Sequence, residues 1–176
     1  MIDEAWGLTD YYFIQLKVHD MGILSFLRKP RLVLPRVQHP IFGLMEATLQ
    51  NDDGSFFWET PGTMQTPKGE ISVFLDGPVT GPSQEQVALW DWIYANSENL
   101  VHLAEPHLLQ TLADFGLERH LDDLCWSAVG LSTDGSRESP WDMSFALPIS
   151  GSKFDGAILT VCFAAGAPTG IVNFDN

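Results

Sequence analysis

The chain has 176 residues, 45% of them hydrophobic, a proportion typical of a folded globular protein and not of a disordered one. It carries 23 acidic and 9 basic residues, a net charge of −14. Nucleic acids and anionic membranes are bound by neutralising their negative charge, so this balance argues against both as partners and favours either a basic protein partner or simple solubility.

Strand-like patterns dominate the first half of the chain. Residues 11–18, 41–50 and 70–76 alternate between apolar and polar side chains, as half-buried strands do. Residues 51–54 read Asn-Asp-Asp-Gly, a turn sequence that tolerates positive φ, so residues 55–60 are expected to return as the next strand. Consecutive strands with short turns predict an antiparallel meander.

Residues 81–116 form the one convincing helical stretch. Ser83 and Gln86 have the spacing of a capping box, in which each side chain bonds the backbone N–H of the other. A polar Asn-Ser pair divides the stretch into two helices, and Gly116 is placed to end the second. Pro106 lies inside the second helix and lacks a backbone donor, so we expect a kink or a fresh helix start there.

The second half returns to strand character over residues 124–131, 141–149 and 155–163. The last of these runs is apolar on both faces, which predicts a central strand covered on both sides. Residues 164–170 are mostly small and predict a loop before a short last strand at residues 171–174.

This element order predicts one α+β domain over residues 1–176, in which a mostly antiparallel, twisted sheet carries both helices on one face. Residues 1–36 hold five of the nine basic residues and either pack on the domain or form a peripheral segment. The first residues lack a signal-peptide pattern and no apolar run reaches about 18–20 residues, so we expect a cytoplasmic protein. Cys125 and Cys162 lie in apolar runs and are predicted to be buried free thiols.

Several short motifs occur between residues 39 and 86: His39-Pro40-x-Phe42-Gly43, Trp58 after a Gly-Ser turn, Gly69-x-Ile71-x-Val73, and Gly81-Pro82-Ser83-x-Glu85-Gln86. This pattern resembles a group of bacterial domains of unknown function, some of which occur beside polymorphic toxin systems and are regarded as immunity proteins. The resemblance implies a small, acidic, cytoplasmic bacterial protein that binds and blocks a partner. That group has no established catalytic residues, so the resemblance assigns none. Gly43 is expected to permit close strand approach.

No spacing in the sequence defines a metal or catalytic site. His102 and His107 are five residues apart, not the four of a His-Glu-x-x-His helix. Cys125 and His120, on an extended segment, would point to different faces. The acidic pair at residues 122–123 supplies at most half of an acid/base pair, because the sequence names no partner carboxylate. We therefore assign no catalytic, cofactor or metal residues, and favour a non-catalytic protein over an enzyme.

The leading hypothesis is a non-catalytic protein-binding domain, an immunity protein that neutralises a basic toxin through its acidic surface. An aromatic residue beside an acidic one at a hairpin end is either such an interface anchor or a core residue. The candidate partner-binding residues are Trp58, Glu59, Asp52, Asp53, Asp122 and Asp123. The alternatives are a hydrolase with a site of distant Asp, Glu and His residues, and an interaction domain whose basic residues 28–36 pair with the acidic body of another copy.

Overall fold

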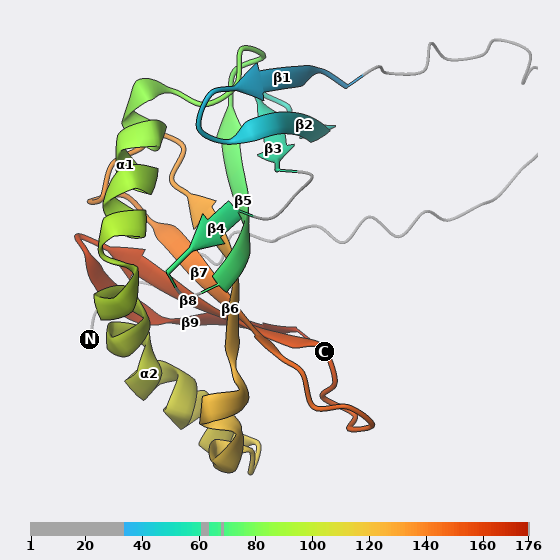
Figure 1. The fold of residues 1–176 in the computed structure, drawn as a ribbon, viewed down its shortest axis with the longest axis vertical. Coiled ribbons are helices and arrows are strands. Elements are labelled where there is room, and N and C mark those ends of the chain that lie inside the picture. The colour runs from blue at the N-terminus through green and yellow to red at the C-terminus, as the bar shows by residue number, and fades with distance from the viewer. Residues whose placement is uncertain (1–33, 61–63, 68, 176) are drawn as a thin grey trace, which may run out of the picture. The chain divides into compact units, whose positions relative to one another are not determined.

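A mixed sheet of nine strands, with two long helices along one face, forms the part of the chain that the structure describes (Figure 1). The structure is a computed structural model that describes residues 34–60, 64–67 and 69–175. The elements within these residues are β1 (Arg36–His39), β2 (Gly43–Gln50), β3 (Phe56–Glu59), β4 (Met64–Thr66), β5 (Gly69–Gly77), α1 (Gln84–Ala95), α2 (Ser97–Asp114), the 3-10 helix η1 (Glu118–Asp123), β6 (Cys125–Leu131), β7 (Trp141–Leu147), β8 (Ala157–Ala164) and β9 (Ala167–Asp175). The predicted α+β class is confirmed, while the strand predicted over residues 11–18 lies outside the described residues.

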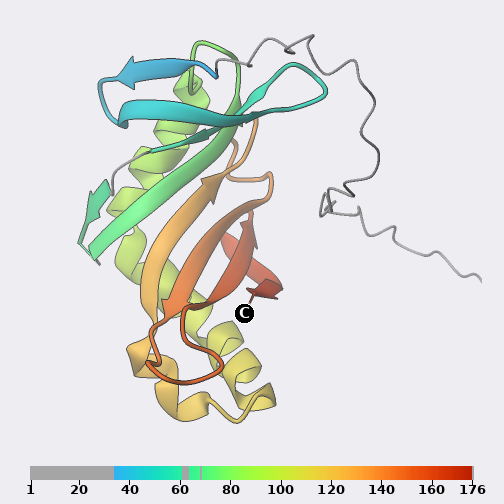
Figure 2. The same ribbon diagram turned by 90° about the vertical axis from the view of Figure 1, so that its right-hand side faces the viewer.

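The sheet has the order β1-β2-β3-β5-β6-β7-β8-β9, and the short β4 pairs with β5 beside this path. Among the described strands, every neighbouring pair is antiparallel except β5 and β6. A parallel pair needs a crossover connection, and α1 and α2 supply it. Both helices lie on the same face of the sheet (Figures 1 and 2). The predicted order of meander, two helices and meander is therefore confirmed.

The β2–β3 hairpin turns where the sequence predicts it. The Asn51 N–H donates to the Ser55 carbonyl at 2.8 Å, and Gly54 has a φ of +85°. Gly43, in the β1–β2 hairpin, has a φ of +70°, and a Cβ there would meet nothing within 4 Å. The expectation that Gly43 permits close strand approach is wrong, because its left-handed backbone is what calls for glycine.

The predicted capping box at the start of α1 is present. The Gln86 N–H donates to Ser83 Oγ at 3.1 Å, and the Ser83 N–H donates to Gln86 Oε1 at 2.9 Å. The Gln86 side chain does more than cap, because its Nε2 also donates to the carbonyls of Asp76 and Ser132 at 2.8 and 3.1 Å. These residues stand near the ends of β5 and β6, so one fully buried side chain ties the helix start to both parallel strands.

Pro106 does not restart the second helix. The helix α2 runs from Ser97 to Asp114 as one element with Pro106 inside it, so of the two expected outcomes, a kink or a fresh helix start, the fresh start is wrong. Proline removes one helical donor and leaves the carbonyl of His102, four residues earlier, without its usual partner. Both residues are exposed, so water can bond that carbonyl and the helix tolerates the proline.

The last three strands depart from prediction in two places. On β8, the side chains facing the helices are fully buried and the alternate ones are half-buried, so within the described residues only one face is fully covered, and the expected cover on both faces is wrong. The expected loop over residues 164–170 is a two-residue turn at Ala165 and Gly166, with φ of 52° and 73°, and β9 begins at Ala167. Two consecutive positive φ values are typical of a type I′ hairpin turn, in which Gly166 is a favoured residue and Ala165 is not.

The hydrophobic core lies between the helices and the inner face of the sheet. Its largest members include Trp58, Trp90, Trp126 and Trp141, each at most 5% exposed. The cysteines do not belong to it: Cys125 is exposed and Cys162 is half-buried, so the prediction of two buried thiols is wrong. Both occupy strand positions that alternate with core residues, which places their side chains on the face opposite α1 and α2.

Candidate acidic pocket

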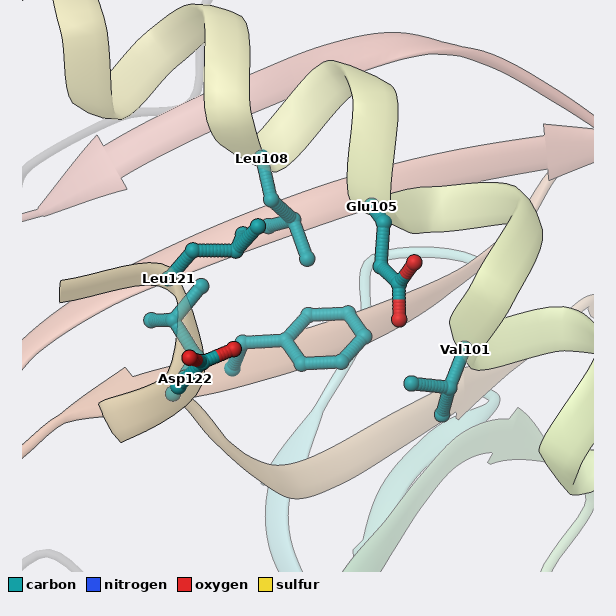
Figure 3. Close-up of a pocket in the computed structure, with 7 residues that line it drawn as sticks. Val101, Glu105, Leu108, Leu121 and Asp122 are labelled. Atoms are coloured by element: carbon teal, nitrogen blue, oxygen red, sulfur yellow. The ribbon is translucent and has the colours of Figure 1, made fainter. Parts of the chain in front are cut away.

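A pocket of about 290 Å³ opens where α2 passes η1 (Figure 3). Its lining joins an apolar floor to two carboxylates, and consists of Val101, Glu105, Leu108, Leu121, Asp122, Leu124 and Phe145. The two carboxylates come from different elements, Glu105 from α2 and Asp122 from η1, and both point into the space between them (Figure 3). A pocket with mostly apolar walls and a few placed polar groups is the usual form of a binding site.

Local sequence explains why these elements meet. The α2 residues Val101, Glu105 and Leu108 are spaced i, i+4 and i+7, so they share one helix face. At the end of α2, the Gly116 N–H donates to Ala113 and the next N–H donates to the Leu112 carbonyl at 2.8 Å. These bonds form a Schellman motif at Gly116, the glycine predicted to end the helix, whose φ is +69°. It ends the helix and turns the chain so that η1 follows directly beside α2.

Hydrogen bonds hold the acidic side chains in different ways. His102 Nδ1 lies 2.9 Å from Glu105 Oε2, which fixes that carboxylate at the edge of the pocket. His120 Nδ1 lies 2.7 Å from Asp123 Oδ2, and Arg119 Nε donates to the other ring nitrogen at 3.1 Å. Among the described residues, nothing bonds the Asp122 carboxylate. Asp122 therefore presents an unpaired negative charge to the pocket.

The structure separates the six candidate partner-binding residues into two groups. Asp122 lines the pocket and Asp123 is its exposed neighbour on η1. Asp52 and Asp53 are exposed at the β2–β3 turn, at the opposite end of the described domain from η1 (Figures 1 and 2). Hydrogen bonds from Ser55 lower the pKa of Asp53, so this carboxylate shapes the turn.

Trp58 and Glu59, both on β3, belong with the hairpin group. Trp58 is fully buried, and its Nε1 donates to the Pro78 carbonyl at 3.1 Å. Of the two interpretations of this tryptophan, an interface anchor or a core residue, the structure supports the core residue, because the indole does not reach the surface that a partner would touch. Glu59 is half-buried beside it.

Glu105 is the pocket residue that the sequence analysis missed. A signal was present: it stands four residues after Val101 and three before Leu108, inside an otherwise apolar helix face. A carboxylate in such a stripe is expected to line a cavity or find a partner, because burying it alone is costly. The predicted half of an acid/base pair at residues 122–123 therefore acquires an opposite carboxylate only through the fold.

At the other candidate sites, the polar groups are already engaged within the chain. A depression of about 370 Å³ lies against α1, where the Arg137 guanidinium stands 5.0 Å above the Trp92 ring, so its cation is already engaged within the chain. His39 Nδ1 accepts the N–H groups of Ile41 and Phe42 at 3.3 Å, and burial lowers its pKa, which suits a neutral structural residue. Within the described ranges, no three His, Cys, Asp or Glu residues gather as metal ligands would.

Comparison with known proteins does not assign the chain to a family. No protein-family model matches the chain, and no curated protein or solved structure is significantly similar to it. The resemblance to immunity-like domains therefore rests on the motifs of residues 39–86 alone. Of the helices in the described part of the chain, none combines the length and apolar character that crossing a bilayer requires.

Proposed function

We propose that this chain is a non-catalytic binding domain that holds a basic protein at the pocket between α2 and η1, as an immunity protein holds a toxin. The observation that carries the proposal is the meeting of an apolar floor with two carboxylates, Glu105 and Asp122, in one pocket. Protein interfaces commonly combine an apolar centre with a polar rim, and such a pocket offers both to a cationic partner.

The charge of the domain supports a basic partner. The described residues carry 19 acidic side chains against four of lysine or arginine. Such an excess steers a cationic protein toward the surface and speeds encounter, and salt weakens the effect. Both cysteines are free thiols, as is usual in a reducing compartment, so the proposal includes a cytoplasmic location.

The test measures binding of the purified full chain to a cationic protein encoded beside its gene, by biolayer interferometry. The affinity is expected to fall at least about tenfold between about 50 and 300 mM NaCl, because salt screens the attraction between opposite charges. An acidic protein of similar size serves as the control and is expected not to bind. Absence of binding at the lower salt concentration would contradict the proposal.

A second candidate function, a hydrolase, is favoured by one specific observation. Glu105 and Asp122 face the same pocket and His102 bonds the first of them, and these are residue types that serve in general acid–base catalysis. His102 has 79% of its side chain exposed and does not line the pocket, which favours binding over catalysis. Turnover of chromogenic esters, phosphates or glycosides that disappears in Glu105→Gln would establish the hydrolase. Absence of turnover would favour the binding domain over the hydrolase.

A further inference from the structure

We propose that the pocket between α2 and η1 receives a single arginine side chain of the partner, with its guanidinium between Glu105 and Asp122. This inference rests on the proposed function and goes further, because it names the chemistry of the residue that anchors the partner. Three properties of the pocket carry it: its size, its apolar walls and the state of its two carboxylates.

The size and walls fit one long side chain. Ligand pockets usually hold about 300–1,000 Å³, so a volume of about 290 Å³ suits one side chain and not a large ligand. Val101 and Leu121 are half-buried and supply aliphatic surface, which an arginine stem can cover while its charged end stays at the rim. An aspartate or glutamate of a partner would meet like charge there, and a short apolar side chain would leave both carboxylates without a cation.

The carboxylates favour arginine over lysine. His102 engages Glu105 Oε2, whereas Oε1 has no hydrogen-bond partner among the described residues, and Asp122 has none at either oxygen. A guanidinium has five donors in one plane, so it can bond two carboxylates that come from different elements at the same time. A guanidinium is also less strongly hydrated than an ammonium group, which suits a pocket with apolar walls.

The first test uses Nα-acetyl-arginine amide as the probe, titrated into the ¹⁵N-labelled full chain and followed by NMR. Nα-acetyl-citrulline amide is the matched control, since it has nearly the same shape without the charge. The arginine probe is expected to shift the amide signals of Val101, Glu105, Leu121 and Asp122 in a saturable way, and the citrulline probe is expected not to. Equal shifts from both probes, or saturable shifts confined to other regions, would overturn the inference.

The second test compares two double variants that remove the same charge. Glu105→Gln with Asp122→Asn is expected to weaken arginine-probe binding at least about tenfold, because both charged acceptors are lost. Glu98→Gln with Asp91→Asn removes two exposed carboxylates outside the pocket and is expected to change it less than about threefold, as general surface charge does. A similar effect of the two variants would show that bulk charge, not the pocket, attracts the probe.

Failure of this inference can be distinguished from failure of the proposed function. If a basic partner binds both double variants with equal affinity, the arginine site and the proposed binding location at the pocket are both wrong, and only the binding of a basic protein stands. If the arginine probe fills the pocket but the cationic neighbour protein does not bind at low salt, the proposed function is wrong and the ligand class of the pocket stands. A lysine probe that binds more tightly than arginine would overturn the choice of side chain.

Discussion

Replacing Gln86 by alanine tests whether one buried amide holds the crossover helices to the sheet. Its side chain takes part in three hydrogen bonds, to the Ser83 N–H and to the carbonyls of Asp76 and Ser132. Each such bond contributes about 1–1.5 kcal/mol net, so Gln86→Ala is expected to lower the free energy of unfolding by about 3–4 kcal/mol. Since Gln86 is fully buried, water cannot replace these bonds without local rearrangement.

The assay is urea denaturation followed by circular dichroism and tryptophan fluorescence, with thermal melting as a second readout. A loss of 3–4 kcal/mol corresponds to a fall of about 10 °C in Tm for a chain of this length. Gln84→Ala is the matched control, because Gln84 is the same residue type on the same helix turn but is exposed. Its effect is expected to stay within about 0.5 kcal/mol.

A third variant separates hydrogen bonding from packing. Gln86→Glu keeps an acceptor for the Ser83 N–H but turns a second oxygen toward two carbonyls, so it is expected to be less stable than the wild type and increasingly so as the pH rises. If Gln86→Ala falls within about 1 kcal/mol of Gln84→Ala, or if Gln86→Glu matches the wild type at neutral pH, the role assigned to this amide is refuted.

Two further predictions concern single residues elsewhere in the described domain. A Cβ on Gly135 would lie 2.3 Å from the backbone nitrogen of Gln86, so Gly135→Ala is expected to lower the free energy of unfolding by about 3 kcal/mol or more. Gly151 is the control, because it has a similar positive φ but open space around it, and Gly151→Ala is expected to lower the free energy of unfolding by about 1–2 kcal/mol. Burial raises the pKa of Asp142 to about 6, above its unfolded value of 3.8, so its charged form weakens the folded state increasingly between pH 4 and 6. In urea denaturation, Asp142→Asn is therefore expected to raise the free energy of unfolding by up to about 3 kcal/mol at pH 7 and by almost nothing at pH 4. An equal increase at both pH values would contradict the role of the buried carboxylate.

The parts of the fold that could be predicted from sequence are those that local interactions determine. The capping box at Ser83 needs only residues three positions apart, and the glycine that ends α2 acts within two residues of the helix. The alternation along β7 can also be read from neighbouring residues, and in the structure its inward side chains are buried and its outward ones half-buried. In these segments, the local sequence pattern and the final structure agree.

The parts that could not be predicted depend on contacts distant in sequence. Small residues at Ala165 and Gly166 suit either a loop or a tight turn, and only pairing of β9 with β8 selects the turn. The expectation that β8 is covered on both faces failed because an apolar sequence does not reveal how many layers the fold has. The pocket could not be predicted either, because Glu105 and Asp122 come to line one pocket only after the chain has turned at Gly116.

The acidic excess makes salt act on folding and on partner binding in opposite directions. Among the described residues, Arg36 and Glu46 form the one ion pair between an arginine or lysine and a carboxylate, at 2.9 Å, so among these residues screening removes more repulsion than attraction. Raising NaCl from about 20 to 500 mM is thus expected to raise the Tm, whereas the affinity for a cationic partner falls over the same range. Thermal melting and interferometry on one salt series measure both. A Tm that falls with salt would show that attraction outweighs repulsion among the charges of the folded chain, and the acidic excess would then give no reason to expect a basic partner.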